Sequence, residues 1–150
     1  MAFELPGFDL DAFVRGTLAE DLGPSGRDVT SESVIPSDAR FRGTMDSRDP
    51  IVVAGLPIAK AFFHFLDPQM DISVLVEEGS RVEQGADLMR LSGHARAMLT
   101  AERSALNTVQ HLSGIATMTR RYVDAIEGTG CTLLDTRKTI PGLRTAQKYA

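Results

Sequence analysis

The chain has 150 residues, of which 43% are hydrophobic and 24% charged, with a formal net charge of −4 at pH 7. These values are typical of one globular unit and exclude a disordered chain or a globally basic nucleic-acid binder. The single cysteine, Cys131, excludes an internal disulfide and a thiolate metal cage, and suits a reducing cytoplasm. The longest apolar stretch, residues 50–66, is interrupted by glycine, proline, lysine and histidine. We therefore expect a cytoplasmic protein that binds neither nucleic acid nor a membrane.

The first 93 residues predict a small α+β unit. Asp9 is a candidate N-cap for a helix over residues 9–20, which Gly23 and Pro24 end. Residues 23–39 are rich in turn-forming side chains and predict a connecting loop. Alternating or apolar stretches predict four strands, over residues 39–45, 51–54, 71–77 and 86–92. A stretch that begins with a proline predicts a helix over residues 57–66.

Two further helices are predicted after residue 94. The strongest covers residues 95–112, where apolar side chains recur at helical spacing. Gly114 predicts a break, and a second helix follows over residues 115–127, closed by Gly128.

The end of the chain predicts the start of a parallel sheet. Residues 131–134 read as a short apolar strand that buries Cys131, and residues 143–150 begin another helix. A strand flanked by helices is typical of β/α folds, in which parallel strands need neighbours on both sides. We therefore expect the chain to stop within a repeating β/α domain.

Charge is divided unevenly along the chain. Residues 1–93 carry eight Lys and Arg against sixteen Asp and Glu, whereas residues 94–150 carry eight against four. Most of the basic residues are arginine, whose forked donors suit carboxylates and phosphates. This pattern predicts either an anionic ligand near the C-terminal part or an ordinary basic surface.

The most concentrated cationic feature is residues 135–142 (DTRKTIPG), named the cationic loop. Arg137 and Lys138 supply adjacent cationic donors, and Thr136 adds a hydroxyl. The loop follows the carboxyl end of the predicted strand, where β/α folds carry reactive loops. Pro141 stands where the next helix would begin, and helix N-termini favour anions. The loop is therefore either a compact anion site or a basic surface turn.

Arg103 is a second candidate because no residue one helical turn away from it is a carboxylate. It is either a ligand-binding cation or part of a solvated helix face. The three histidines, His64, His94 and His111, lack the spacing of a metal site and predict structural roles.

Residues 76–88 offer a different class of function, because they resemble the hairpin turns of lipoyl and biotinyl carrier domains. Those domains attach their cofactor to a lysine at an exposed hairpin tip. The lysines here are Lys60, Lys138 and Lys148, and none lies in that segment. The sequence therefore weighs against a noncatalytic carrier module.

A set of ordered motifs covers essentially the whole chain. The motifs are residues 20–23 (EDLG), 28–30 (DVT), 100–107 (TAERSALN), 112–117 (LSGIAT), 119–122 (TRRY), 135–139 (DTRKT), 141–144 (PGLR) and 148–150 (KYA). Together they closely resemble the quinolinate phosphoribosyltransferase family, also called carboxylating nicotinate-nucleotide pyrophosphorylases.

The resemblance implies an N-terminal α/β sandwich with its connecting helix over residues 1–112, and the start of an incomplete parallel β/α barrel over 113–150. It implies phosphoribosyl transfer from phosphoribosyl diphosphate to quinolinate with loss of CO2, giving nicotinate mononucleotide and diphosphate in de novo NAD biosynthesis. The family's glycine-rich Asn-His-Arg segment does not follow residue 150, so we expect the isolated chain to be an inactive fragment. The alternative within the fold is a phosphoribosyltransferase-like protein for another anion, such as a molybdenum-transport-associated relative.

The resemblance also assigns site residues. It implies that Thr136, Arg137 and Lys138 bind quinolinate in their own barrel, while Arg103 reaches quinolinate in the neighbouring subunit. Arg103, Arg137 and Lys138 are the expected catalytic residues. The implied assembly is a homodimer or higher homo-oligomer with composite sites. The implied cofactor is Mg2+, bound with phosphoribosyl diphosphate by ligands expected beyond residue 150.

Overall fold

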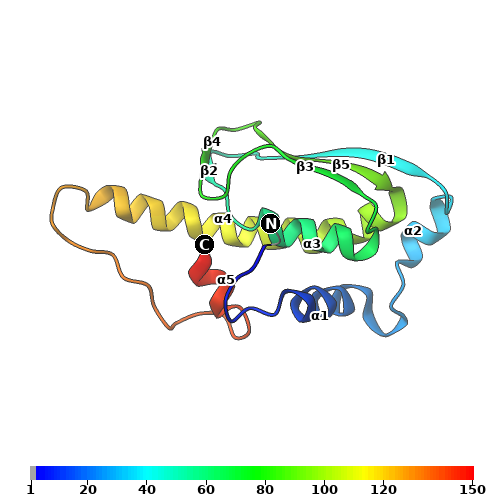
Figure 1. Ribbon diagram of the computed structural model, residues 1–150, viewed down its shortest axis with the longest axis horizontal. Helices are drawn as coiled ribbons and strands as arrows, with labels where there is room; N and C mark the ends of the chain where they lie inside the picture. Colours follow the sequence, from blue (N-terminus) through cyan, green and yellow to red (C-terminus); the bar gives the residue numbers. More distant parts are fainter. Residues whose placement is uncertain (1–2) are drawn as a thin grey trace.

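The structure is a computed structural model that describes residues 3–150. Its elements, in chain order, are α1 (Leu10–Leu22), η1 (Gly23–Ser25), α2 (Val29–Val34), β1 (Arg40–Asp46), β2 (Ile51–Val52), α3 (Leu56–Leu66), β3 (Asp71–Val74), β4 (Arg81–Val82), β5 (Asp87–His94), α4 (Ala95–Ala125) and α5 (Arg144–Tyr149). In Figure 1 the strands form an upper layer, α3 and α4 lie beneath them, and α1 and α5 lie lowest. The layers agree with the predicted α/β sandwich.

The main sheet has three antiparallel strands in the order β1-β5-β3. Arg40 of β1 pairs with His94, and Asp71 of β3 pairs with Ser92, so β5 is the central strand. Strands β2 and β4 form a separate two-stranded sheet. The strands predicted over residues 39–45, 51–54, 71–77 and 86–92 are confirmed, although β2 and β3 are shorter than the sequence suggested.

The core lies where α3 meets α4 under the sheet. Phe62 and Phe63 of α3 are almost completely buried, and so are Ala101 and Ala105 of α4. Small side chains at these α4 positions let the bulky α3 side chains pack against the helix backbone. This packing fixes α4 against α3.

Helix α4 runs unbroken from residue 95 to 125, so the predicted break at Gly114 is wrong. Glycine weakens a helix by only about 1 kcal/mol, and contacts on both sides offset this. Ser113 Oγ accepts from the Ala54 N–H at 3.0 Å, and Thr117 Oγ1 accepts from the Val52 N–H at 2.8 Å. The domain boundary predicted between residues 112 and 113 therefore lies inside one continuous helix. Neither α4 nor any other helix of the described residues is long and apolar enough to cross a membrane.

The turn-rich segment of residues 23–39 contains more helix than the sequence predicted. It forms the short helix η1 and the helix α2. Asp28 is the N-cap of α2 and accepts from the Ser31 N–H at 3.0 Å. The capping aspartate was the available sequence signal. At the start of α1, the predicted cap is confirmed, because Asp9 Oδ1 accepts from the Ala12 N–H.

The predicted strand over residues 131–134 is not formed. These residues are exposed and pair with no strand among the described residues, and Cys131 is exposed rather than buried. They belong to a wide arc that leaves the end of α4 and returns to α5 (Figure 1). A β-strand needs a partner for its backbone hydrogen bonds, and apolar composition alone does not supply one.

Gly55 provides a test of how α3 and α4 are packed. It has a φ of 99°, and a Cβ placed on it would lie 2.9 Å from Leu112 Cδ1. We expect Gly55→Ala to lower the free energy of unfolding by about 2–4 kcal/mol, since backbone strain and overpacking add. Urea denaturation measures the loss.

Gly79→Ala is the matched control. Gly79 has a φ of 77° but open space where its Cβ would lie. It should show the strain alone, about 1–2 kcal/mol. Equal losses in the two variants would contradict the close contact with Leu112.

Candidate functional site

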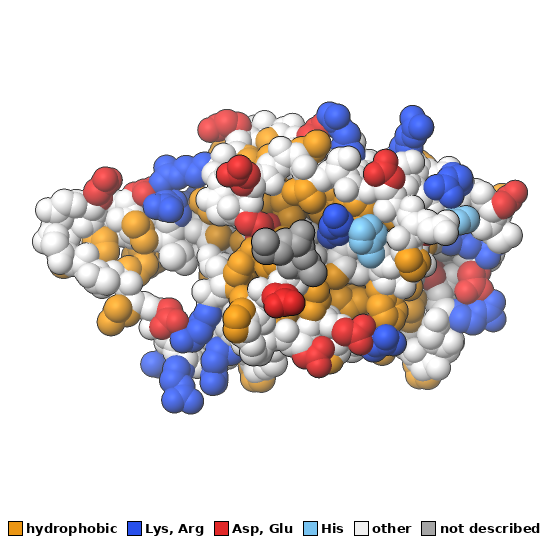
Figure 2. All heavy atoms as spheres, viewed as in Figure 1, with side chains coloured by type: hydrophobic (Ala, Val, Ile, Leu, Met, Phe, Trp, Pro, Cys, Tyr) orange, Lys and Arg blue, Asp and Glu red, His pale blue; other side chains and the backbone are white. Residues whose placement is uncertain are grey.

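The cationic loop presents two free cations to solvent. Thr136, Arg137 and Lys138 are all exposed. None of the ion pairs among residues 3–150 involves Arg137 or Lys138. Figure 2 shows Lys and Arg side chains gathered at the lower left, over the loop that precedes α5 in Figure 1. The loop therefore offers positive charge that no carboxylate of the described chain neutralises.

A tight turn ends the cationic loop. The Leu143 N–H donates to the Ile140 carbonyl at 3.0 Å, and Gly142 has a φ of 82°. Proline followed by a glycine with positive φ is the signature of a type II turn. Helix α5 begins at Arg144, so Pro141 lies in the turn and not at a helix start, which corrects the sequence prediction.

Side chains of α5 hold both ends of the loop. Gln147 Oε1 accepts from the Ile140 N–H at 2.9 Å, and Lys148 Nζ lies 2.6 Å from Asp135 Oδ2. The Gln147 amide also donates to His111 Nε2 of α4 at 2.8 Å. These contacts fix the loop to α5, and α5 to α4, without using Arg137 or Lys138.

A cavity of about 620 Å³ separates the loop from the end of α4. Thr136 and Lys138 line it from the loop, and Ile115 and Met118 line it from α4. The opposite end of the loop, at Pro141 and Gly142, lines a second cleft. Arg103 lines neither cavity. The structure thus brings Thr136 and Lys138 together but does not join them with Arg103.

The sequence suggested that Arg103 is unpaired, but in the structure it has a partner. Its Nη2 lies 3.3 Å from Asp21 Oδ2 of α1, although the side chain of Arg103 is 67% exposed. The pair lacks hydrogen-bond geometry, and Asp21 Oδ2 has no hydrogen-bond partner among the described residues. Inspection of one helical turn could not reveal this partner, because Asp21 belongs to another helix. Because the Arg103 side chain is largely exposed and a guanidinium has five N–H donors, donors remain available for a further partner.

Residues of α4 near Arg103 hold α2 in place. Asp28 accepts from the Ser31 N–H and hydroxyl and, at 3.0 Å, from the Thr100 hydroxyl. These hydrogen bonds, helped by the charge of Arg103, hold the pKa of Asp28 below its usual value.

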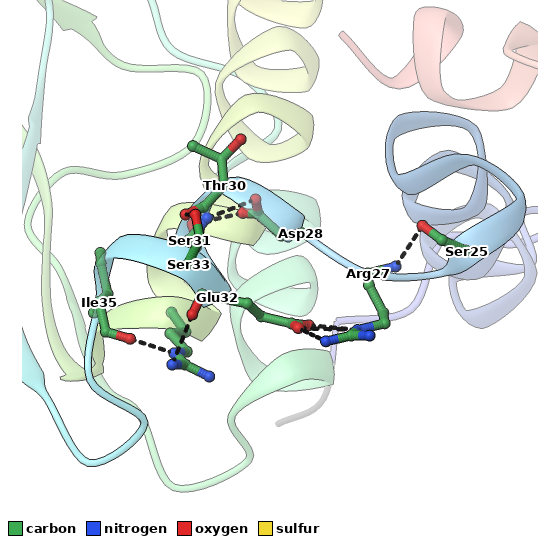
Figure 3. Close-up of polar contacts among 9 residues, drawn as sticks. Ser25, Arg27, Asp28, Thr30, Ser31, Glu32, Ser33 and Ile35 are labelled. Atoms are coloured by element: carbon green, nitrogen blue, oxygen red, sulfur yellow. Dashed lines mark hydrogen bonds and ion pairs between the residues drawn. The ribbon is translucent and has the colours of Figure 1, made fainter.

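Arg96 holds the other end of α2. It donates to the carbonyls of Ile35 and Glu32 at 2.7 and 3.0 Å. Arg27 additionally pairs with the Glu32 side chain (Figure 3). The segment before β1 is therefore docked along the same α4 face that carries Arg103.

The histidines make contacts within the fold. His64 Nε2 lies 3.1 Å from the Met70 carbonyl, and the backbone N–H of His94 donates to Asp67 Oδ2. His111 contacts Gln147, as described above. Over residues 3–150 there is no group of three or more His, Cys, Asp or Glu side chains placed to hold a metal ion.

Comparison with known proteins identifies the family. The model of the quinolinate phosphoribosyl transferase N-terminal domain matches residues 28–113, and the model of the C-terminal domain matches residues 115–150. The chain belongs to the quinolinate phosphoribosyl transferase family. The resemblance seen in the sequence motifs is thereby confirmed.

Relatives of this family resemble the chain in sequence and in structure. A nicotinate-nucleotide pyrophosphorylase [carboxylating] of Mycobacterium leprae is 43% identical over 139 residues, covering 91% of this chain and 49% of the relative. NadC from Streptococcus pyogenes superposes with a TM-score of 0.90 at 32% identity, covering 98% of this chain and 52% of that one. The nicotinate-nucleotide pyrophosphorylase of Francisella tularensis gives a TM-score of 0.86 at 35% identity, covering 99% of this chain and 54% of that one. The chain spans about half the length of the curated relatives it matches.

Asp28 yields a pH-dependent prediction. Because its pKa is lowered in the fold, its contribution to stability is present above its ordinary pKa of 3.8 and is lost as the pH falls. We expect Asp28→Asn to lower the free energy of unfolding at pH 7 by about 1–2 kcal/mol. The difference from wild type should shrink below about pH 3.5.

Urea denaturation at pH 7 and at pH 3 measures the difference in the free energy of unfolding between wild type and Asp28→Asn. Asp38→Asn is the control, because Asp38 is exposed and makes no side-chain contact among the described residues. A wild-type advantage over Asp28→Asn that persists undiminished at pH 3 would contradict the role of the Asp28 charge.

Proposed function

We propose that this chain provides the quinolinate-binding residues of a carboxylating nicotinate-nucleotide pyrophosphorylase. The observation that carries the proposal is the pair of free cations, Arg137 and Lys138, on a loop anchored at both ends in a member of this family. Quinolinate carries two carboxylates on adjacent ring carbons, and forked or point-charge donors bind carboxylates strongly. Thr136 supplies a hydroxyl at the cavity that Lys138 also lines, while Arg137 is not among the residues that line this cavity.

The reaction proposed for the protein is phosphoribosyl transfer followed by decarboxylation. The ring nitrogen of quinolinate forms a bond to the anomeric carbon of phosphoribosyl diphosphate as the bond to diphosphate breaks. The positive charge of the pyridinium so formed stabilises the electron pair that stays on C2 when CO2 departs, and a proton then adds to that pair to give nicotinate mononucleotide. Cations that bind the two carboxylates orient the ring. The reaction therefore needs no covalent nucleophile from the protein.

Arg103 completes the proposed site from a neighbouring subunit. It precedes Ile115 by twelve residues on α4, which is about 18 Å along the helix axis. Ile115 lines the cavity of Thr136 and Lys138, so Arg103 is too distant to share that cavity within one chain. An exposed guanidinium paired only weakly with Asp21 is suited to a ligand held by a second copy. We therefore propose a homodimer or higher homo-oligomer with composite sites.

Further assignments belong to the same proposal. Phosphoribosyl diphosphate is the second substrate. The family implies magnesium, but residues 3–150 contain no group of three or more His, Cys, Asp or Glu side chains that fits a metal ion. A cytoplasmic location is supported by the lone free thiol of Cys131. We also propose the division into a sandwich over residues 1–112 and a barrel segment over residues 113–150.

The first test is titration of the chain with quinolinate and with nicotinate, which lacks one carboxylate. Wild type should bind quinolinate more tightly. Arg137→Ala and Lys138→Ala should each weaken quinolinate binding by about 10- to 150-fold, the cost of one charge-assisted contact. Isothermal titration calorimetry measures the affinities.

Arg42→Ala is the control, because it removes an exposed arginine that belongs to β1 and not to the cationic loop. Equal quinolinate affinity in wild type, Arg137→Ala and Lys138→Ala would assign the loop a structural role.

The composite site is tested by mixing Arg103→Ala with Lys138→Ala. Each variant alone has one defect in every site. In a re-equilibrated mixture of dimers, half are heterodimers with one intact site, so about one quarter of the tight quinolinate sites should reappear. Calorimetric stoichiometry counts these sites. No recovery above either parent would show that Arg103 does not act across the interface.

A further inference from the structure

Glu78 joins three parts of the chain through one carboxylate. Its Oε1 accepts from the Leu56 N–H at 2.7 Å, and its Oε2 accepts from the Gly55 N–H at 2.8 Å. Oε2 also accepts from the Tyr149 hydroxyl at 2.6 Å. The turn before β4, the start of α3 and the last residue of α5 therefore meet at this side chain.

The carboxylate stabilises the start of α3 from outside that helix. Gly55 is the N-cap residue of α3 and has no side chain, so no cap of the helix's own satisfies its first N–H groups. A negative charge at a helix N-terminus is favourable, because the helix dipole and the free N–H groups point toward it. These two hydrogen bonds fix the position of Glu78 independently of Tyr149.

The hydrogen bond from the Tyr149 hydroxyl ties α5 to the fixed carboxylate of Glu78. Burial, together with the hydrogen bond and charge of Glu78, raises the pKa of the Tyr149 phenol, so the hydroxyl stays protonated and remains a donor. Its ring packs edge-on against Phe3, with ring centroids 5.6 Å apart. The two residues before it, Gln147 and Lys148, hold Ile140 and Asp135 at the two ends of the cationic loop.

We propose that Glu78 is a positioning residue for the cationic loop, acting through Tyr149 and α5. The inference rests on the proposed function, in which that loop receives quinolinate. Glu78 touches no residue of the loop itself; its influence passes along the hydrogen bond to Tyr149 and the short helix. Loss of that bond lets α5 fray, and the loop then loses both of its α5 contacts.

Two substitutions separate this role from the cap of α3. Glu78→Gln replaces one acceptor oxygen by an NH2 donor where all three partners are donors, so it weakens both connections. Tyr149→Phe removes only the hydroxyl and leaves both backbone bonds of Glu78 to α3 intact. Glu77→Gln is the matched control, because Glu77 is exposed and its side chain forms no hydrogen bond or ion pair among the described residues.

The first readout is amide hydrogen exchange at Ile140, followed by NMR, which needs no ligand. The Ile140 N–H is protected by Gln147 in the folded chain. Exchange should be about tenfold faster in Glu78→Gln and in Tyr149→Phe, and unchanged in Glu77→Gln. The double variant should exchange no faster than the single variants, since both act through one bond.

The second readout is quinolinate affinity, measured by calorimetry on the same proteins. Glu78→Gln and Tyr149→Phe should each weaken binding about five- to tenfold, because a mobile loop must be ordered on binding. If wild type binds quinolinate and both variants bind equally well, or if Ile140 exchange does not change, the positioning role is overturned. If wild type does not bind quinolinate while Ile140 exchange responds, the proposed function fails and the mechanical link between Glu78 and the loop stands.

A spectroscopic readout checks the bond itself. In a Tyr122→Phe background Tyr149 is the only tyrosine, and the chain has no tryptophan. Tyrosinate absorbance at alkaline pH then reports this phenol alone. Adding Glu78→Gln should move its appearance to lower pH, because a raising influence is removed. An unmoved titration would overturn the contact on which the proposal depends.

Discussion

The hydroxyls of Ser113 and Thr117 hold the structure together, because they bind the extended segment Val52–Ala54 to the middle of α4. Backbone N–H groups on such a segment must find acceptors when a helix covers them. The two side chains lie one turn apart on α4 and supply these acceptors on either side of Gly114. The helix therefore continues where its local propensity is poorest. Its length then sets the separation between Arg103, near its start, and the cavity at its far end.

Some of the unevenly distributed charges of the chain interact with one another inside the fold. Arg96, Thr100 and Arg103 recur along one face of α4 at helical spacing. Each contacts the acidic segment before β1: Arg96 the α2 carbonyls, Thr100 the Asp28 carboxylate, and Arg103 that of Asp21. Two acidic residues of the N-terminal part, Asp21 and Asp28, thus contact this face of α4. Arg137 and Lys138 form no ion pair among the described residues, and the same holds for Arg120, Arg121 and Arg144.

Local signals predicted the elements whose stability is local. Capping by Asp9, the alternation along β5 and the proline at the start of α3 each identified an element that the structure contains. Prediction failed where a distant partner decides. Gly114 is held helical by residues 52–54, and residues 131–134 lack the neighbouring strand that would pair with them. For the site, the motif predicted the cations of the loop, but the Asp21 partner of Arg103 and the Glu78 contact to α5 join residues far apart in sequence.

The way the cationic loop is anchored has a direct consequence for the proposed binding of quinolinate. An anion site loses affinity if its cations are engaged by internal carboxylates, and it also loses affinity if its backbone must be ordered when the ligand arrives. Here different residues meet the two demands. Asp135 and Ile140 tie the loop backbone to Lys148 and Gln147, and Arg144 Nε donates to Thr139 at 3.4 Å. Every one of these contacts bypasses Arg137 and Lys138. The loop can therefore be held in one conformation while its two central cations stay hydrated and free, and a dicarboxylate that reaches them displaces water and no internal ion pair.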